Sequence, residues 1–437
     1  MMQEAIDKKS VIFYGAGAEA KHNLVKWEAQ GLVPVCFADR DKLKHYTKFA
    51  AGDACHANTE EYDILPLDVT IIKYPNYVIY PTVAPHNIPS VTKYLLDSRI
   101  PKERIRYAGQ YYKGLGCNQL GKSFVSYYGI RTCVVEPPRY FDVNLSSDVD
   151  GMYRQYKSKT DSFVLDNILG KPTLCKGCYQ LQHGLYEIKP QLTSVNISSD
   201  HDDFCNSKCV YCVKYPKPSE KNTLKRKMYI LDVLKYFTDK ANGEPFRFNI
   251  SGGEVSISSY CDEVMRHISE NENLYVDFST NAIVYSQSLA DAIVTKRVEL
   301  VISLDSGTPE TMVRIRGLDC FESTVRNCVR YAQHFPKKTM LLLKYIIIEG
   351  INDNETDIRG FLNIAKNIGC TAQLSADNHN MGKANLSVKG LEMCYLFMRI
   401  CRDNNIAFRY IDYYFNEVDR QAIDRYRQKI QLAVDSN

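Results

Sequence analysis

The chain has 437 residues, of which 45% are hydrophobic and 24% are charged, a composition typical of a soluble globular protein with a substantial core. The formal net charge of +4 is too small and too dispersed to indicate a nucleic-acid or membrane partner. The polar N-terminus and the short apolar runs predict no secretory signal and no transmembrane helix. An odd count of 15 cysteines argues against a secreted disulfide framework and favours the reducing cytoplasm.

The length predicts two or three domains, and the first is expected over residues 1–125. A buried-strand pattern, SVIFYGAGAEA, is followed by a helical stretch, KHNLVKWEAQG, and a second strand-like run, VPVCFADRD. Further along come the strand-like YVIYPTV, the helix-like SVTKYLLDSRI and the run RIRYAG. Strands that alternate with helices predict a doubly wound, Rossmann-like parallel sheet.

A glycine-rich turn joins the first of these strands to its helix. Gly15 and Gly17, with alanine at the third glycine position, match the dinucleotide-binding fingerprint, and Asp39 ends the second strand. In that fingerprint the glycines admit a phosphate to the helix N-terminus and the acid binds ribose hydroxyls. The alternative is an empty unit that keeps the tight turn for packing. The region resembles small Rossmann-like modules attached to sugar- and polysaccharide-modifying enzymes.

Residues 126–190 have a weaker pattern. The two prolines of EPPRYFDV and the polar run SSDVDGMYRQYKSKTDS predict irregular or connecting structure. This segment also carries the C-x2-C pair Cys175 and Cys178.

Residues 191–437 are expected to form one domain of six strand–helix units. Strands are predicted at 192–198, 246–254, 274–281, 298–307, 340–350, 371–380 and 406–414, with helices at 223–240, 261–270, 288–297, 309–335, 355–369 and 391–405. Six units are fewer than the eight of a closed barrel. Most of the strands end in polar or glycine-bearing residues, and in parallel βα architectures such ends meet at one mouth.

Three cysteines, Cys205, Cys209 and Cys212, follow the first of these strands in one C-x3-C-x2-C loop. Three thiolates at this spacing can hold three irons of a cubane iron–sulfur cluster. The missing fourth ligand leaves one iron open, as in a catalytic rather than a structural metal site. Zinc is the alternative, but it needs a second cysteine pair or two histidines, and the nearby candidates are only His201, Asp202 and Asp203.

The trio, together with Tyr211, matches the signature loop of the radical S-adenosylmethionine (radical SAM) superfamily, which the chain resembles over about 191–415. The resemblance implies a partial (β/α)6 barrel, a 4Fe–4S cluster on the three cysteines, and S-adenosylmethionine chelated by the open iron. It also implies that one electron from the cluster cleaves the cofactor to methionine and a 5′-deoxyadenosyl radical, which abstracts hydrogen from a substrate. The electron would come from a one-electron reductant such as flavodoxin or ferredoxin.

Two further motifs resemble parts of the family's cofactor pocket. Gly252-Gly253-Glu254 resembles the motif for the methionine amino group, since a carboxylate accepts hydrogen bonds from an ammonium and glycines allow close approach; Val255 stands where many members have proline. Ser279-Thr280-Asn281 suits a ribose, although a polar strand end also caps a following helix. Ala282 replaces the glycine that often follows in the family.

Polar residues at the later strand ends add candidates. Ser303 and Asp305 resemble the family's serine–leucine–aspartate motif. The resemblance also implies an arginine that binds the methionine carboxylate in a bidentate manner. Arg314 and Arg316 are both possible, and we choose Arg316. The alternative for each arginine is a solvated charge on a helix surface. The last two strands offer Asn352, Asp353, Asp377, Asn378 and His379. His379 is a candidate proton donor or a structural histidine.

The pair Cys175 and Cys178 is half of a metal site. A second iron–sulfur cluster with Cys117 and Cys133, a zinc site and an uncoordinated pair are all open for it. The segment after Cys401 has no cysteine, unlike the cysteine-rich extension that usually carries auxiliary clusters in the family.

The sequence assigns no catalytic residue for the reaction on the substrate. We expect a small-molecule substrate, a sugar or nucleotide-sugar, because of the N-terminal module. A peptide is the alternative, and the absence of an auxiliary-cluster extension argues against it. From a different class, the chain would be a non-catalytic iron–sulfur sensor or electron carrier, which needs four cluster ligands and no adenosyl pocket.

Overall fold

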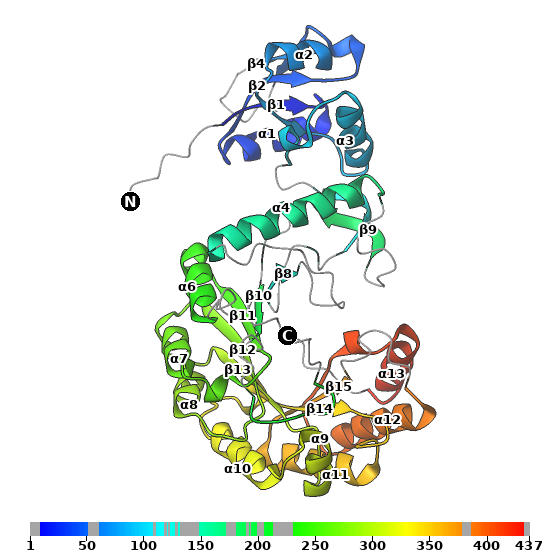
Figure 1. The fold of residues 1–437 in the computed structure, drawn as a ribbon. Coiled ribbons are helices and arrows are strands. Elements are labelled where there is room, and N and C mark those ends of the chain that lie inside the picture. The colour runs from blue at the N-terminus through cyan, green and yellow to red at the C-terminus, as the bar shows by residue number, and fades with distance from the viewer. Residues whose placement is uncertain are drawn as a thin grey trace, which may run out of the picture. The chain divides into compact units, whose positions relative to one another are not determined.

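A computed structural model gives the fold of the chain (Figure 1). It describes residues 9–50, 61–107, 111–117, 120, 123–126, 130–131, 148–171, 181–188, 192, 194–198, 205–212, 230–377 and 386–431. The chain divides into two compact units, one of residues 1–122 with 157–191 and one of residues 123–156 with 192–437. Residues 126–190, which we expected to be a separate connecting segment, are thus shared between the two units.

The first unit is built on a five-stranded sheet with the order β3-β4-β2-β1-β5. Its strands are β1 (Lys9–Tyr14), β2 (Leu32–Ala38), β3 (Lys48–Ala50), β4 (Glu61–Leu65) and β5 (Val78–Pro81). Strands β4, β2, β1 and β5 are parallel, and the edge strand β3 is antiparallel to β4. Helices α1 (Ala18–Glu28), α2 (Leu67–Lys73) and α3 (Ile88–Asp97) connect them.

Alternating residues of these strands feed two separate cores. Val11 and Phe13 of β1 pack with α1 residues, whereas Ile12 and Tyr14 pack with α3 residues. Since successive strand residues point to opposite faces, α1 and α3 cover opposite faces of the sheet. The predicted doubly wound architecture is therefore confirmed. In the described part of the run RIRYAG, Ile105 makes an isolated parallel bridge to Ile79.

The prediction of irregular structure within 126–190 is wrong for the stretch after residue 148. Helix α4 (Val149–Ile168) occupies it, and β6 (Tyr111–Gly116) pairs with β9 (Gln182–Glu187) in an antiparallel ribbon. The buried residues of α4 are Met152, Tyr156, Thr160, Val164, Asn167 and Ile168, and all of them except Asn167 recur every four positions. That period is the helical signal in this polar run.

The second unit contains a nine-stranded sheet with the order β16-β15-β14-β13-β12-β11-β10-β7-β8. Its strands are β7 (Ser123–Ser126), β8 (Ile130–Arg131), β10 (Ser194–Ser198), β11 (Phe246–Ser251), β12 (Leu274–Thr280), β13 (Val298–Ser303), β14 (Leu341–Ile347), β15 (Thr371–Ala376) and β16 (Phe408–Tyr410). Neighbours from β7 to β16 are parallel, and only β8 is antiparallel. The sheet ends in two edges, as a partial barrel must.

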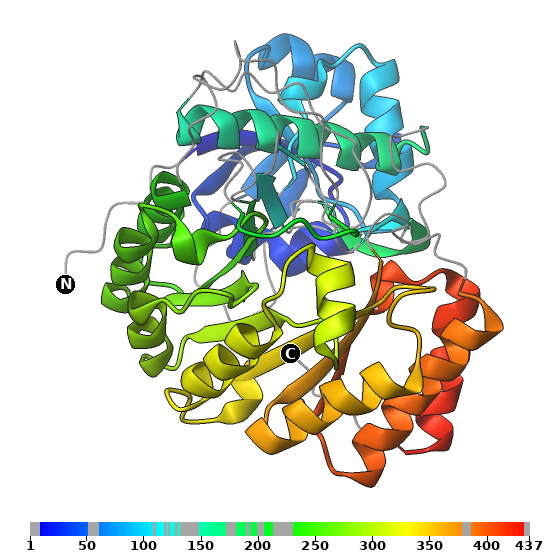
Figure 2. The same ribbon diagram turned by 60° about the horizontal axis from the view of Figure 1, so that its bottom comes forward.

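Helices line the outer side of this curved sheet (Figure 2). They are α6 (Ile230–Ala241), α7 (Cys261–Glu270), α8 (Gln287–Val294), α9 (Pro309–Arg316), α10 (Phe321–Ala332), α11 (Glu355–Ile368), α12 (Val388–Asp403) and α13 (Glu417–Lys429). The six predicted strand–helix units are present from β10 to α12. The predicted single helix over 309–335 is two helices, because Gly317 ends α9 in the left-handed conformation at φ 72°. Helix α13 was not predicted.

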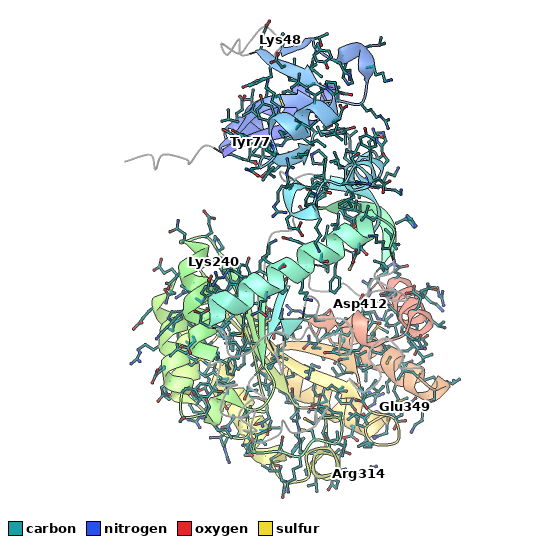
Figure 3. All side chains as sticks on the ribbon, turned by 45° about the horizontal axis from the view of Figure 1, so that its top comes forward. Lys48, Tyr77, Lys240, Arg314, Glu349 and Asp412 are labelled. Carbon is teal, nitrogen blue, oxygen red and sulfur yellow. The ribbon has the colours of Figure 1, made fainter. Side chains whose placement is uncertain are left out.

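The first half of α4, up to residue 156, belongs to the second unit. Tyr153 contacts Phe237 of α6 edge-on. The Nζ of Lys240, a residue of α6 that Figure 3 labels, lies 4.8 Å from the centroid of the Tyr153 ring. Tyr236 also donates a hydrogen bond to Asp150 at 2.7 Å. Among the described residues, no helix is both long and apolar enough to cross a bilayer.

Candidate functional site

The cysteine loop is anchored to the end of a barrel helix. Lys208 N donates to the Arg316 carbonyl and Val210 N donates to the Ile315 carbonyl, both at 2.9 Å. These carbonyls belong to the last turn of α9, where backbone acceptors lack helical partners. The loop thereby provides hydrogen-bond donors for the free carbonyls at the end of α9, and these two hydrogen bonds fix the position of the loop backbone.

The three sulfurs differ in exposure. Cys205 and Cys212 are exposed, and Cys209 is partly buried. The Ser207 hydroxyl lies 3.5 Å from the Cys205 sulfur and 3.3 Å from the Cys209 sulfur. Within the described residues, no group of three or more His, Cys, Asp or Glu side chains is already arranged around a metal position. The donor set fits an iron–sulfur cluster nevertheless, because it offers three thiols on one accessible loop.

A buried ion pair holds the middle of this loop. The Arg316 guanidinium donates to the Cys209 sulfur at 2.9 Å and to the Asp305 carboxylate at 2.8 Å. Tyr211 donates its hydroxyl to the same Asp305 oxygen at 2.6 Å, and its ring lies 5.7 Å from the guanidinium carbon. The other Asp305 oxygen accepts from the Ile346 N–H. Four side chains from three segments thus form one closed network.

The charges in this network are mutually compensated. Burial lowers the pKa of Arg316, but Tyr211, Asp305 and Cys209 outweigh it and hold that pKa above its ordinary value. Burial raises the pKa of Tyr211 well above its usual range, so the phenol stays protonated and donates. Removing one member would leave a buried charge without its partner, which is costly.

The two candidate arginines have different environments. Arg314 is exposed on α9 and donates to the Gly350 carbonyl at 2.9 Å (Figure 3). Arg316 is 3% exposed and already bonds Cys209, Asp305 and the Ser303 carbonyl. In this structure the guanidinium that we expected to bind the methionine carboxylate therefore serves the cysteine loop.

Glu254 is buried and fully hydrogen-bonded. One carboxylate oxygen accepts from the Ser256 and Thr280 hydroxyls at 2.6 and 2.7 Å, and the other accepts from the Asn281 N–H at 2.6 Å. Burial raises the pKa of Glu254, and these three hydrogen bonds oppose the rise. The carboxylate that we expected to meet an ammonium here joins the ends of β11 and β12.

Asn281 extends this link to the cysteine loop. Its side-chain amide donates to Asn206 at 2.7 Å and lies 3.9 Å from the Cys205 sulfur. The next residue, Ala282, is buried and has φ 52°. Alanine pays a steric cost in this left-handed region that glycine avoids, which explains why the family often has glycine there.

The remaining candidates fall into two groups. Gly252 and Gly253 have φ of 73° and 54°, a consecutive left-handed pair that requires glycine. Ser279 and Ser303 are partly exposed on the sheet face away from the helices.

The polar residues after β14 and β15 have structural roles or lie outside the described residues. Asn352 is buried and donates to the Asp305 and Ile346 carbonyls at 2.9 and 2.7 Å. Asp353 is buried and pairs with Lys389 at 3.2 Å. Asp377 is described, but Asn378 and His379 are not. The other candidates that lie outside the described residues are His201, Asp202, Asp203, Cys133, Cys175 and Cys178.

The acid of the N-terminal fingerprint is engaged inside its own unit. Asp39 accepts hydrogen bonds from the backbone N–H groups of Ala16 and Asp41 at 2.8 and 2.9 Å, and Lys44 pairs with it at 3.2 Å. Burial raises the pKa of Asp39, and these contacts outweigh it and lower that pKa. A Cβ at Gly17 would meet nothing within 4 Å, so the start of α1 is open.

Two residues that the sequence analysis did not consider face the inner side of the barrel. Lys344 of β14 and Gln373 of β15 are paired in register. Lys344 is the one charge within the apolar run MLLLKYIIIEG before its terminal glutamate. A charged residue within a buried strand is the signal that could have identified it.

Comparison with protein families finds a match within the second unit. Residues 201–362 match the model of the radical SAM superfamily. No curated protein matched the chain.

Several solved structures resemble it. SuiB from Streptococcus suis bound to the precursor peptide SuiA is 12% identical, with a TM-score of 0.41 over 62% of this chain and 57% of that chain. anSMEcpe with bound AdoMet is 16% identical, with a TM-score of 0.39 over 50% and 64%. A radical SAM methyltransferase from Sphaerobacter thermophilus is 18% identical, with a TM-score of 0.33 over 47% and 63%. This chain spans less than two thirds of each of these proteins.

Proposed function

Because this chain carries a radical SAM domain, and so belongs among the enzymes that use a 4Fe–4S cluster and S-adenosylmethionine, we propose that Cys205, Cys209 and Cys212 hold that cluster. When bound, the cluster supplies the electron that cleaves S-adenosylmethionine and so provides the 5′-deoxyadenosyl radical that abstracts hydrogen from a substrate. The single observation that carries the assignment is the double anchoring of the cysteine loop. Arg316 bonds Cys209 on one side, and Asn281 bonds Asn206 on the other.

The residues of the two anchors act on the loop in different ways. Arg316 places a positive charge and an N–H donor at the Cys209 sulfur, which favours the thiolate that a metal requires. Glu254 fixes the backbone of Asn281, whose amide in turn positions Asn206 beside Cys205. We propose that the cofactor pocket is lined by Gly252, Gly253, Ser279, Thr280, Asn281 and Ser303. Tyr211 and Arg316 would belong to the same site and hold the cysteine loop in place through Asp305 and Cys209.

Reconstitution of the full chain without oxygen tests the cluster assignment. We expect about four irons and four sulfides per chain at the trio, by the cubane stoichiometry, and loss of that iron when all three cysteines are changed to alanine. Cys36→Ala, at a core cysteine of the first unit, is the matched control. A triple variant that keeps its iron and visible absorbance would show that the trio is not the ligand set.

Turnover separates the enzyme from an iron–sulfur sensor or electron carrier. Dithionite-reduced protein with S-adenosylmethionine should release 5′-deoxyadenosine, slowly in the absence of substrate. A fully loaded cluster that never yields 5′-deoxyadenosine would favour the non-catalytic class.

We propose a small polar substrate, a sugar or nucleotide-sugar. Its support is the N-terminal Rossmann-like unit and the polar inner face of the barrel. A deuterated substrate of this class should transfer deuterium into 5′-deoxyadenosine and accelerate its release. If a panel of sugars and nucleotide-sugars does neither while peptides do, the substrate is of the other class.

A further inference from the structure

Four polar side chains form a row across the inner face of the barrel. Ser303, Lys344, Gln373 and Arg409 lie on the adjacent strands β13, β14, β15 and β16 and are paired in register, each with the next. The residues that alternate with them, Leu343, Leu374 and Phe408 among them, are packed in the helix-covered core. The row therefore points to the opposite face of the sheet, away from these helices.

Two members of this polar row have a buried polar atom without a hydrogen-bond partner. Gln373 is 5% exposed, and its side-chain carbonyl oxygen has no hydrogen-bond partner. A buried acceptor without a donor costs roughly 1–3 kcal/mol, so such groups are rare in folded proteins and call for an explanation. The Nε of Arg409, which is also in the row, has no hydrogen-bond partner either. A bound donor would satisfy the Gln373 oxygen.

The row also has an uncompensated positive charge. Arg409 pairs with Glu299 through two contacts, one of 3.1 Å. Arg247 donates to the two Asp277 oxygens from its Nε and one terminal nitrogen, each at 2.7 Å. On this face, within the described residues, Lys344 is the one charged side chain that has neither an ion pair nor a hydrogen bond. Burial lowers the pKa of Lys344, and Asp305 opposes the effect. A largely buried ammonium without a partner is stabilised most strongly by binding an anion.

The row lies close to the cysteine loop. The Lys344 carbonyl accepts from the Asp305 N–H at 3.0 Å, and the Asp305 side chain is joined through Arg316 to the Cys209 sulfur of the loop. Asp305 and Arg316 form their own ion pair at 2.8 Å and compensate each other. A ligand bound at the row would thus lie within electrostatic range of the proposed cluster, where a substrate needs to be.

We propose that Lys344 and Gln373 bind the substrate by a carboxylate and an adjacent hydroxyl or amide N–H. Lys344 pairs with the carboxylate, and the Gln373 oxygen accepts from the neighbouring donor. A carboxylate fits better than a phosphate, because phosphate sites gather several cations or backbone N–H groups, and this row offers one free cation. This inference deepens the proposed function and rests on it for the identity of the ligand as substrate.

Two probe pairs test it with the full chain. In the first pair, D-glucuronate carries the carboxylate on a sugar and D-glucose is its neutral partner. In the second pair, N-acetylglutamate carries the side-chain carboxylate on an amino acid, and N-acetylglutamine has an amide in its place. Binding is measured by ligand-observed NMR titration and by thermal shift. We expect the acid of one pair to bind and its neutral partner not to bind, and the pair that responds identifies the source of the carboxylate.

The variants are Lys344→Gln and Gln373→Glu, with exposed Lys337→Gln as the matched control. Each of the first two should weaken binding of the acid at least about tenfold, since a charged hydrogen bond is lost or a like charge is added. Gln373→Glu keeps the size of the side chain and tests the site even if Lys344→Gln fails to fold. Equal binding of acid and neutral probes, no binding of either, or variants that bind as tightly as wild type would each overturn the proposal.

Two measurements made in parallel separate this proposal from its premise. If Lys344→Gln weakens S-adenosylmethionine affinity and leaves the probes unaffected, the carboxylate bound at the row is that of the cofactor, and the proposal is wrong. If wild type holds no cluster and binds no S-adenosylmethionine while the acid probes still bind at the row, the proposed function fails and the anion site stands.

Discussion

At the scale of single residues, the chemical type of a side chain does not by itself determine which partner that side chain contacts. Glu254 and Arg316 both have the chemistry to bind the methionine part of S-adenosylmethionine. The structure places both in closed networks, with Thr280 and Asn281 around the carboxylate and Cys209 and Asp305 around the guanidinium. Both residues therefore act on the cysteine loop, directly or through Asn281.

Arg316 should tune the proposed cluster. Hydrogen bonds to cluster sulfurs and nearby charge set the reduction potential, so losing the Arg316 N–H should make the cluster harder to reduce. In Arg316→Gln we expect the midpoint potential to fall by about 50 mV, close to the 59 mV of a tenfold one-electron effect. Redox titration followed by electron paramagnetic resonance measures it.

Arg316→Lys, which keeps the charge, and exposed Arg314→Gln serve as controls for that experiment. We expect a smaller fall in the first and none in the second. An unchanged potential in a fully loaded Arg316→Gln protein would show that the contact with Cys209 has no electronic consequence.

Gly17 decides whether the first unit binds a nucleotide. The position is open and has φ −116°, so Gly17→Leu should fold normally while blocking the approach of a phosphate to α1. If the unit binds a nucleotide or nucleotide-sugar, that ligand should raise the melting temperature of wild type and not of Gly17→Leu. A panel that shifts neither protein would leave the unit a scaffold, as the internal hydrogen bonds of Asp39 favour.

At the scale of elements, close backbone contacts fix how the strand ends meet the helices. The loop after β13 lies against α11, where Asp357 accepts from the Gly307 N–H at 3.1 Å and from the Thr311 hydroxyl at 2.7 Å. A Cβ on Gly307 would come within 1.9 Å of the Asp357 carbonyl oxygen. The loop that carries Asp305 can therefore approach α11 only with glycine at this position.

Gly307→Ala should destabilise the barrel unit by about 3 kcal/mol, the upper range for overpacking a rigid contact. Hydrogen exchange of the α11 amides, followed by mass spectrometry, reports it locally. Gly17→Ala, where the added methyl group meets open space, should change exchange in its own unit very little. Wild-type protection of α11 in Gly307→Ala would contradict the close contact.

At the scale of the whole molecule, the two units are interleaved along the chain. The core of the first unit contains Val164 and Ile168 of α4 and also Ile188, all from beyond residue 156. The domain boundary that we predicted at residue 125 would separate Val164, Ile168 and Ile188 from the core in which they pack. Burying such side chains contributes about 1.5–3 kcal/mol each, which together approaches the whole stability of a small unit.

A fragment of residues 1–125 should therefore fold poorly. Joining 1–122 to 157–191 with a flexible linker should restore cooperative melting, because it returns the missing core residues. Thermal melting by circular dichroism and resistance to limited proteolysis compare the two. If the 1–125 fragment melts as cooperatively and at as high a temperature as the joined fragment, the contribution of residues 157–191 is dispensable.

What the sequence determined by itself was local or periodic. The cysteine spacing, the alternation of strands and helices, and the Gly252–Gly253 turn each depend on neighbours a few residues away, and the fold class and the family followed from them. Helix α4 also had a local signal in its four-residue period, but its polar composition obscured it.

Only the tertiary structure decided which side chains meet. Lys344 and Gln373 are adjacent because β14 and β15 pair in one register, and a shift of one residue would turn either to the other face. Arg316 reaches Cys209, 107 positions away in the sequence, because the loop docks on the end of α9. Such contacts depend on how segments distant in the sequence pack together. The interaction energy of each pair depends on the burial and distance that this packing creates, and neither can be read from a local stretch of sequence.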